Sequence, residues 1–485
     1  MGQIQEFQER LRRTAPWWRR AGKPRLAALI AVLWVSGTGL GAEYYVDSTA
    51  ATDGSGSSAS PWKTLATVNG RTFQPGDTVY LKRGGVWAES LSSDDDGTAG
   101  SPITFGAYGS GDAPRIQGAT IYGDHTVLEN LVIDHEKAAS DALRLSGARS
   151  CTLRSLTVRN GTRDGIELDD ADGVVIDSCL IHHFLNGGFT NQVDGHGIVA
   201  TNTQGITIRG TDIHHVSGDS FQTDPDRDTD TPDDILIESC HFWTSPLTSD
   251  FNDGWHAGDR PGENAIDMKM ITADWDLVPR CRITIRSTLA HGWKRDSFIT
   301  NKAAFNMKEK IEAVFDRVTV YDCEIAFRLR GTRGNANATI QNAVVYDCEK
   351  AFRAEDAVAN LKLYNSTLGD GLATLFEVVS GSGESTWELR NNAFLGSKPA
   401  QAGHASNRAA SAADFVNAAA RDYHLAAGSA LIDAGTAVAS VTTDRDGSAR
   451  GAAIDVGAYE FGGTAPPPPP APPAAPRNLR VEIVR

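Results

Sequence analysis

The chain has 485 residues, 46 Lys and Arg against 61 Asp and Glu, a formal net charge of −15 and 40% hydrophobic residues. This hydrophobic content excludes a wholly disordered chain. The acidity disfavours nucleic acid as the main partner, because phosphate binding requires a basic surface. We expect three segments: a signal peptide at 1–42, one folded domain at 43–461 and a Pro-rich tail at 462–485.

The first segment has the three parts of a secretory signal. An Arg-rich start precedes an apolar run from Leu26 to about Val35, and small residues follow up to Ala42. The run is short for a membrane span, and an uncleaved anchor is the alternative. We expect a secreted or periplasmic monomer that leaves the membrane when the signal is removed. At the other end, Pro466 to Pro470 indicate a stiff polyproline II tail.

Between these ends, short β-branched runs recur at a regular spacing. The run at 174–183 returns at 206–215, and both end in Ile-His-His. A second kind of segment has five residues that alternate between apolar and polar, with an apolar second position throughout. These second positions are Leu143, Ile166, Ile198, Phe221, Ile266, Phe305, Phe327, Phe352 and Phe376.

Their spacing gives a basic coil of about 22–25 residues, with longer coils where loops are inserted. Self-similarity of this kind in β-rich segments predicts an all-β fold, a single-stranded right-handed parallel β-helix with an N-terminal cap and a C-terminal closing segment.

The six cysteines permit disulfides in an exported chain. However, Cys179 and Cys240 fall at one repeat position, which favours inward stacking positions. A bridge between Cys323 and Cys348, in adjacent coils, is the alternative.

Residues of each five-residue segment that point outward should stack into columns about 4.8 Å apart per coil. Acidic residues come first along these columns, at Glu167, Asp169, Asp224 and Asp267. Basic residues follow, at Lys269, Lys308, Arg328, Arg330 and Arg353. Either this is a solvated ladder of charges, or it is a groove for a linear anionic polysaccharide.

This division suits cleavage of a uronate polymer by β-elimination. Positive charge neutralises the sugar carboxylate, and a base then removes the proton at C5 as the O4 link departs. We expect Lys269 to be that base, because Lys308 on the next coil disfavours its protonation. Lys308 and then His196 are the next candidates. Asn306, Arg328, Arg330 and Arg353 would bind the substrate.

At these residues the chain resembles Ca²⁺-dependent β-helix polysaccharide lyases of the pectate-lyase-like families. The resemblance rests on the acidic coil at 217–224 and on the later strand Asn264-Ala265-Ile266-Asp267-Met268-Lys269. It departs from that pattern at Gln222, where an Asp is expected, and at Asp267, where those families have their lysine. The resemblance implies a Ca²⁺ cofactor, and we expect it to be held by Asp169, Asp219, Asp224 and Asp267. The ends of the domain, such as Pro61-Trp62 and Asp455-Val456-Gly457, resemble the caps of exported polysaccharide-active β-helix proteins.

Two insertions could add to such a site. The alternating aspartates of 224–234 suit Ca²⁺, and a solvated acidic loop is the equal alternative. The insertion at 244–263 leads directly into Asp267 and carries Trp255, which we expect to stack on a sugar. A loop folded on its own aromatic side chains is the alternative.

Three other functions stay open. Asp169-Asp170, His196 and Lys269 follow the order of polygalacturonase-like hydrolases. A uronate C5-epimerase would share the proton abstraction, and a glycan-binding adhesin would need no catalysis. The sequence does not name the polymer.

Overall fold

The computed structural model describes residues 41–224, 232–269, 279–308, 310–331, 336–381 and 383–463. The predicted signal peptide and Pro-rich tail therefore lie outside the described residues, except for residues 41–42 and 462–463. Within the described ranges, no helix is long and apolar enough to span a membrane.

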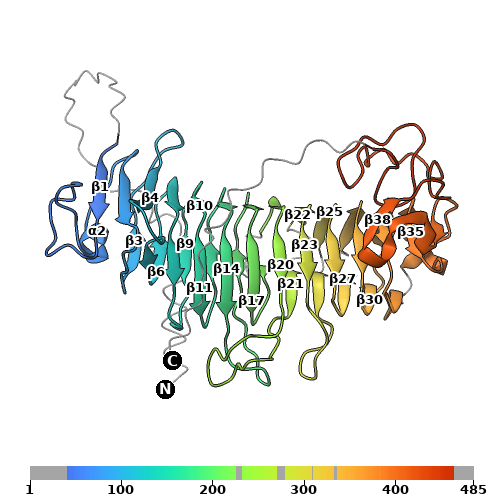
Figure 1. Cartoon of the computed structure of the whole chain (residues 1–485), viewed down its shortest axis with the longest axis horizontal. Coiled ribbons are helices and arrows are strands. Elements are labelled where there is room, and N and C mark those ends of the chain that lie inside the picture. The colour runs from blue at the N-terminus through green and yellow to red at the C-terminus, as the bar shows by residue number, and fades with distance from the viewer. Residues whose placement is uncertain are drawn as a thin grey trace. The chain divides into compact units, whose positions relative to one another are not determined.

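All described strands except the β37–β38 pair form three parallel sheets, and from β2 to β35 successive strands of the chain pass from one sheet to another (Figure 1). Sheet 1 has thirteen strands: β1 (Glu43–Val46), β2 (Thr78–Lys82), β4 (Ile103–Tyr108), β7 (Thr126–Glu129), β10 (Thr152–Arg154), β13 (Val175–Asp177), β16 (Thr207–Arg209), β19 (Ile235–Glu238), β22 (Cys281–Arg286), β25 (Ile311–Asp316), β28 (Asn337–Gln341), β31 (Asn360–Tyr364) and β34 (Glu388–Arg390).

Sheet 2 has twelve strands: β5 (Arg115–Ile116), β8 (Val132–Asp134), β11 (Thr157–Gly161), β14 (Leu180–Phe184), β17 (Asp212–Val216), β20 (His241–Trp243), β23 (Leu289–His291), β26 (Thr319–Tyr321), β29 (Val344–Tyr346), β32 (Thr367–Leu368), β35 (Ala393–Leu395) and β36 (Arg408–Ala410). Sheet 3 has eleven: β3 (Ser90–Ser93), β6 (Gly118–Ile121), β9 (Leu143–Ser146), β12 (Ile166–Asp169), β15 (Ile198–Thr201), β18 (Phe221–Asp224), β21 (Asn264–Met268), β24 (Ala303–Met307), β27 (Ile325–Arg330), β30 (Lys350–Glu355) and β33 (Thr374–Val378).

The register of sheet 3 is the one that the sequence predicts. The apolar second positions pair from coil to coil, from Leu143 opposite Ile166 through to Phe352 opposite Phe376. All but Phe376 are buried, and Phe305 and Phe327 have ring centroids 5.3 Å apart. The predicted parallel solenoid is confirmed.

From β7 onward, each described coil turns from sheet 1 to sheet 2 on two residues. The first of the two adopts a left-handed conformation, with φ of 56° at Ser178, 53° at Ser239 and 53° at Asn342. This region is strained for most side chains, and short polar residues and Gly tolerate it best. The second residue points inward and stacks with its counterparts, and Cys179, Thr211 and Cys240 are examples.

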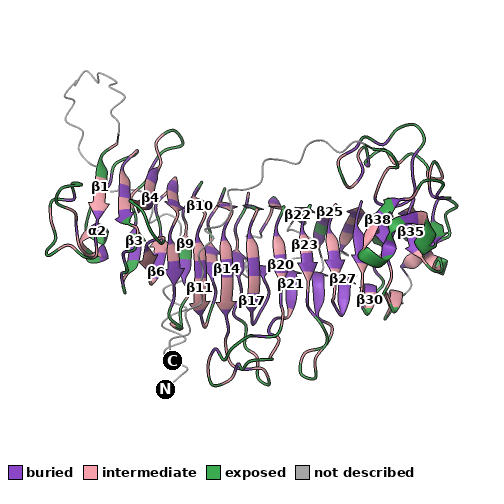
Figure 2. Cartoon of the chain, in the orientation of Figure 1, coloured by how far each residue is buried: buried purple, intermediate pink, exposed green. Residues whose placement is uncertain are grey.

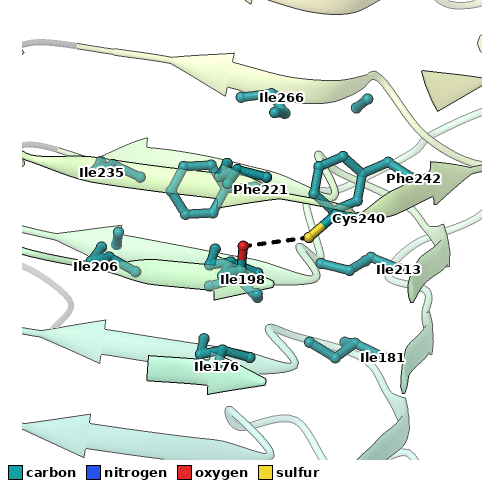
Figure 3. Close-up of a cluster of buried hydrophobic side chains, with 14 of the residues drawn as sticks. Ile176, Ile181, Ile198, Ile206, Ile213, Phe221, Ile235, Cys240, Phe242 and Ile266 are labelled. Atoms are coloured by element: carbon teal, nitrogen blue, oxygen red, sulfur yellow. Dashed lines mark hydrogen bonds between the residues drawn. The ribbon is translucent and has the colours of Figure 1, made fainter. Parts of the chain in front are cut away.

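The inward positions are buried, and buried residues recur along the strands from one end of the solenoid to the other (Figure 2). In the section through the core, Ile198, Phe221 and Ile266 of sheet 3 face residues of the other two sheets, and Cys240 Sγ donates to the carbonyl of Ile208 (Figure 3). All six cysteines are buried and free, so the predicted stacking positions hold and the alternative bridge does not form.

Short elements close the two ends. The helix α2 (Leu65–Asn69) buries Leu65 and Val68 near the first coils. At the far end, the hairpin of β37 (Phe415–Asn417) and β38 (Asp422–Leu425) is antiparallel and packs against the last strands of sheet 2. Four short 3-10 helices lie in the C-terminal part, at Glu384–Thr386, Ala400–Ala402, Ala412–Asp414 and Ala418–Ala420.

Candidate active site

Two insertions pack against each other beside the middle of sheet 3. They are 185–195 and 244–263, and each connects a strand of sheet 2 to a strand of sheet 3. They join at Phe189, whose N–H donates to the carbonyl of Gly254 at 2.9 Å. Leu185, Leu247, Phe251 and Trp255 form a small hydrophobic cluster of their own. The insertions therefore form a packed wall.

Trp255 belongs to the inside of that wall. Its side chain is fully buried, and its Nε1 donates to the carbonyl of Asn186 at 3.0 Å. The ring consequently holds the two insertions together and offers no open surface on which a sugar could stack, contrary to our expectation.

Next to the wall, Asp267 on β21 binds three nitrogen donors. Asn306 Nδ2 donates to Oδ1 at 3.0 Å, and Lys308 Nζ donates to Oδ2 at 2.9 Å. Lys269 Nζ lies 3.3 Å from Oδ2 and also donates to Gln222 Oε1 at 2.6 Å. Asp267 is 3% exposed, whereas the lysine side chains retain 29% and 26%. Two lysines with partly accessible side chains thus flank one buried carboxylate.

The pKa of Lys269 is raised. Burial alone would lower it, but the carboxylates of Asp267 and Asp219 outweigh that effect. The sequence argument, in which Lys308 lowers this pKa, is therefore wrong in direction, because it left out the carboxylate that both lysines share. The backbone of Lys269 is fixed by Thr223, whose hydroxyl accepts from its N–H at 2.7 Å.

His196 and Asp219 lie behind this pair of lysines in the interior of the site. His196 Nδ1 accepts from the N–H of Asp219 at 2.8 Å, so the ring proton resides on Nε2. Burial lowers the pKa of His196, which keeps the ring neutral. Burial, followed by Asp267 and Glu263, raises the pKa of Asp219, and Asn264 Nδ2 donates to its carboxylate at 2.8 Å.

The residues that follow the order of polygalacturonase-like hydrolases do not come together, because Asp169 lies far from His196. The N–H of His196 donates to Asp164 Oδ1 at 2.8 Å, which places His196 five residues before Asp169 in the sheet register. Along extended chain that separation is about 16 Å. Asp169 instead forms an ion pair with Arg144 of the preceding coil.

The three predicted substrate-binding arginines converge on one carboxylate. Arg328 Nε donates to Glu355 Oε1 at 3.0 Å, Arg353 Nε donates to the same oxygen at 2.6 Å, and Arg330 Nε lies 3.5 Å from Oε2. Burial would raise the pKa of Glu355, but the hydrogen bonds and charges of Arg328 and Arg353 lower it. Arg353 also pairs with Glu377 of the next coil, so three arginines face two carboxylates and this part of sheet 3 keeps a net positive charge.

The four aspartates that we expected to hold Ca²⁺ do not meet. Asp169 and Asp224 are separated by strand β15, which is about 9–10 Å, and Asp219 precedes Asp224 by five residues of chain. Asp267 is already bound by three donors. These residues do not fit a calcium site, since Ca²⁺ requires six to eight oxygens around one point.

In the described part of the chain, the carboxylates that do gather are those of Asp141, Asp164 and Glu167, with one oxygen of each within 4.8 Å of the others. Burial, Asp141 and Asp164 raise the pKa of Glu167 to about 8. Arg163 Nε lies 2.9 Å from Asp141 Oδ1, so a cation is already present at this group. The alternative metal loop at 224–234 lies mostly outside the described residues, and its Asp233 is paired with Arg282 Nη2 at 2.7 Å.

Residues 117–244 match the family model described as the right handed beta helix region. The chain is a right-handed parallel β-helix. No curated protein sequence matches it significantly.

Among solved structures, this β-helix is similar to pectate lyase Pel9A at 16% identity, with 88% of this chain and 98% of that chain covered and a TM-score of 0.49. A rhamnogalacturonan lyase is also 16% identical, with 78% and 91% covered and a TM-score of 0.49. An alginate lyase from Paenibacillus sp. is 17% identical, with 65% and 94% covered and a TM-score of 0.41. These likenesses concern the fold and assign no activity.

Sequence reasoning missed two partners in the site of this β-helix. Asn264 joins adjacent coils, since it donates to Asp219 and accepts from the N–H of Ala303 at 3.0 Å. Glu355 is the acceptor of the arginine group, and the aligned columns held the signal, because Glu355 pairs directly with Arg330 in the sheet register.

Proposed function

We propose that this β-helix is an exported polysaccharide lyase that cleaves a uronate-containing polymer by β-elimination. The observation that carries the proposal is the pair of partly accessible lysines, Lys269 and Lys308, on the shared carboxylate of Asp267. The arginine group on β27 and β30 supports it, because these side chains continue the positive charge along the axis of sheet 3.

In the proposed reaction, a sugar carboxylate lies against the ammonium of Lys308 and the amide of Asn306. Neutralising that charge makes the adjacent C5 proton more acidic. Lys269, in its uncharged form, accepts the C5 proton. The C5–H electron pair forms the C4–C5 double bond, the C4–O4 bond breaks, and water protonates the departing O4. Lys269 then returns its proton to solvent.

Asp267 has a positioning role in this scheme. It holds both lysines at the same point of the groove, and Gln222 Oε1 fixes Lys269 from the preceding coil. Since the expected calcium ligands do not gather, no step of this mechanism uses a metal ion.

The experiment is a panel of uronate polymers incubated with the full chain. Unsaturated ends, detected by their ultraviolet absorbance, are the expected product. Reducing ends without that absorbance would show a hydrolase instead. Deuterium incorporation at C5 without cleavage would show an epimerase, and binding without either change would show an adhesin.

A further inference from the structure

Four histidines cluster on two adjacent coils of sheet 2, away from the lysine pair of sheet 3. They are the His-His dipeptides of β14 and β17, where His182 lies opposite His214. The rings of His182 and His214 stack with centroids 4.9 Å apart and 5° between planes, and those of His183 and His215 stack at 5.1 Å and 18°.

Within each coil, the two rings are nearly perpendicular and turn the same nitrogen toward each other. His182 Nδ1 lies 2.7 Å from His183 Nδ1, and His214 Nδ1 lies 2.6 Å from His215 Nδ1. One nitrogen of each of His183, His214 and His215 lies within 4.8 Å of the other two. Several imidazole nitrogens therefore converge on one small volume.

A hydroxyl outside the cluster orients one of these rings. His215 Nε2 contacts Ser245 Oγ at 3.0 Å, at the start of the insertion 244–263. When Nε2–H donates to this hydroxyl, the lone pair of His215 is on Nδ1, toward the other rings. Hydrogen-bonded partners of this kind fix the tautomer of metal-binding histidines.

Burial keeps the rings uncharged. It lowers the pKa of His183 and of His215 to about 4, and it lowers the pKa of His182 and His214 as well. Neutral imidazole is the form that binds metals, and it suits zinc, copper and nickel rather than calcium.

Aromatic side chains surround the cluster without closing it. Trp243 stacks on His214 at 4.3 Å, and Phe251 lies 6.4 Å from His183. His215 is 6% exposed, while His183 and His214 are half-buried, so an ion can reach the nitrogens from solvent.

We propose that His183, His214 and His215 form a site for a transition-metal dication of the zinc class, with His182 beside it. A bound ion would join the coils of β14 and β17, and through Ser245 it would brace the insertion that walls the lysine site. This inference does not depend on the lyase proposal.

The test is a zinc titration of the full chain by calorimetry, with cobalt absorption spectra as a second measurement. We expect one equivalent of zinc and a ligand-field band with cobalt. His183→Asn and His215→Asn should each weaken zinc binding at least tenfold. Asparagine suits these positions because both histidines have positive φ, of 61° and 53°. His404→Asn, in the C-terminal part, is the matched control and should bind like the wild type.

A gentler variant covers the case in which a histidine variant fails to fold. Ser245→Ala should weaken zinc binding about tenfold, in the range for loss of a metal ligand's hydrogen-bond partner. Zinc should also raise the Tm of the wild type and of His404→Asn, and raise that of His183→Asn less at the same zinc concentration. The proposal is overturned if the wild type binds neither zinc nor cobalt. It is also overturned if His183→Asn and His215→Asn both bind zinc as tightly as the wild type does.

Discussion

Lys308 Nζ lies 2.9 Å from Asp267 Oδ2, the same oxygen that Lys269 Nζ approaches to 3.3 Å. Two lysines from adjacent coils thus share one carboxylate oxygen, and their roles need not be equal. Lys269 also bonds Gln222 of the preceding coil. In the proposed reaction, Lys269 abstracts the C5 proton and Lys308 neutralises the carboxylate of the sugar.

Lys269→Ala should reduce kcat by about 10²–10⁴-fold, the range for loss of a general base, with substrate binding largely kept. Lys362→Ala, an exposed lysine on sheet 1, is the control and should behave as wild type. The measurement is the initial rate of unsaturated-end formation. If Lys269→Ala keeps a near-normal kcat and Lys308→Ala loses it, Lys308 is the base and Lys269 neutralises the sugar carboxylate.

The pH profile should rise through the alkaline range. A base must be deprotonated to act, and the pKa of Lys269 is raised above its ordinary value, so kcat/KM should still climb with pH at the ordinary pKa of a lysine, about 10.4. Asp267→Asn removes a carboxylate that raises this pKa, so its rising limb should move to lower pH. Asp169→Asn, whose carboxylate pairs with Arg144, should leave the limb in place. An unmoved limb in Asp267→Asn would exclude Lys269 as the titrating base.

Arg328→Ala should raise KM with little change in kcat, because it removes binding that the ground state and the transition state share. We expect roughly three- to tenfold, the effect of losing about 1 kcal/mol from a partly exposed ion contact. Arg286→Ala, from a comparable ion pair on sheet 1, should leave KM unchanged. A fall in kcat with constant KM would place Arg328 in the chemical step.

Phe305→Ala should lower the free energy of unfolding by about 3–5 kcal/mol, the cost of removing a buried aromatic ring. The ring is fully buried and contacts both Phe315 and Phe327, with centroids 5.0 and 5.3 Å away. Phe461→Ala, at an exposed phenylalanine, should change stability little. Denaturant unfolding measures the free energy of unfolding of both variants. A Phe305→Ala variant as stable as the wild type would contradict the buried position of this ring.

Exhaustive treatment with EDTA should leave the elimination activity within about twofold, since the lysines supply the neutralising charge. Loss of activity that Ca²⁺ restores would show that the reaction needs a cation. Glu167→Gln would then test whether the gathered group of Asp141, Asp164 and Glu167 holds it.

The sequence predicted the fold well because the inward positions repeat. Once Phe221, Ile266 and Phe305 are aligned, the register of every neighbouring outward residue follows, and it agrees with the structure. Contacts between neighbours in that register, such as Asp267 with Asn306, were within reach of the same argument.

The separation of Asp219 from Asp224 was within reach as well, because five residues of extended chain span about 16 Å and place the two carboxylates apart. Two other features were not. Insertions have no repeat partner, so the burial of Trp255 depends on how 185–195 and 244–263 fold together. The direction of the pKa of Lys269 needed the position of Asp267 Oδ2, which no pattern of residue types supplies.

The corner from sheet 1 to sheet 2 has the same two-residue length in every described coil from β7 to β35. Extra length in a coil therefore enters elsewhere, and the insertions at 185–195, 244–263 and 292–302 all precede a strand of sheet 3. The corner between sheets 1 and 2 thus has a constant length, whereas the loops that lead into sheet 3, which carries the lysines, vary in length. Lengthening one of these loops should therefore leave the stacking of the solenoid unchanged.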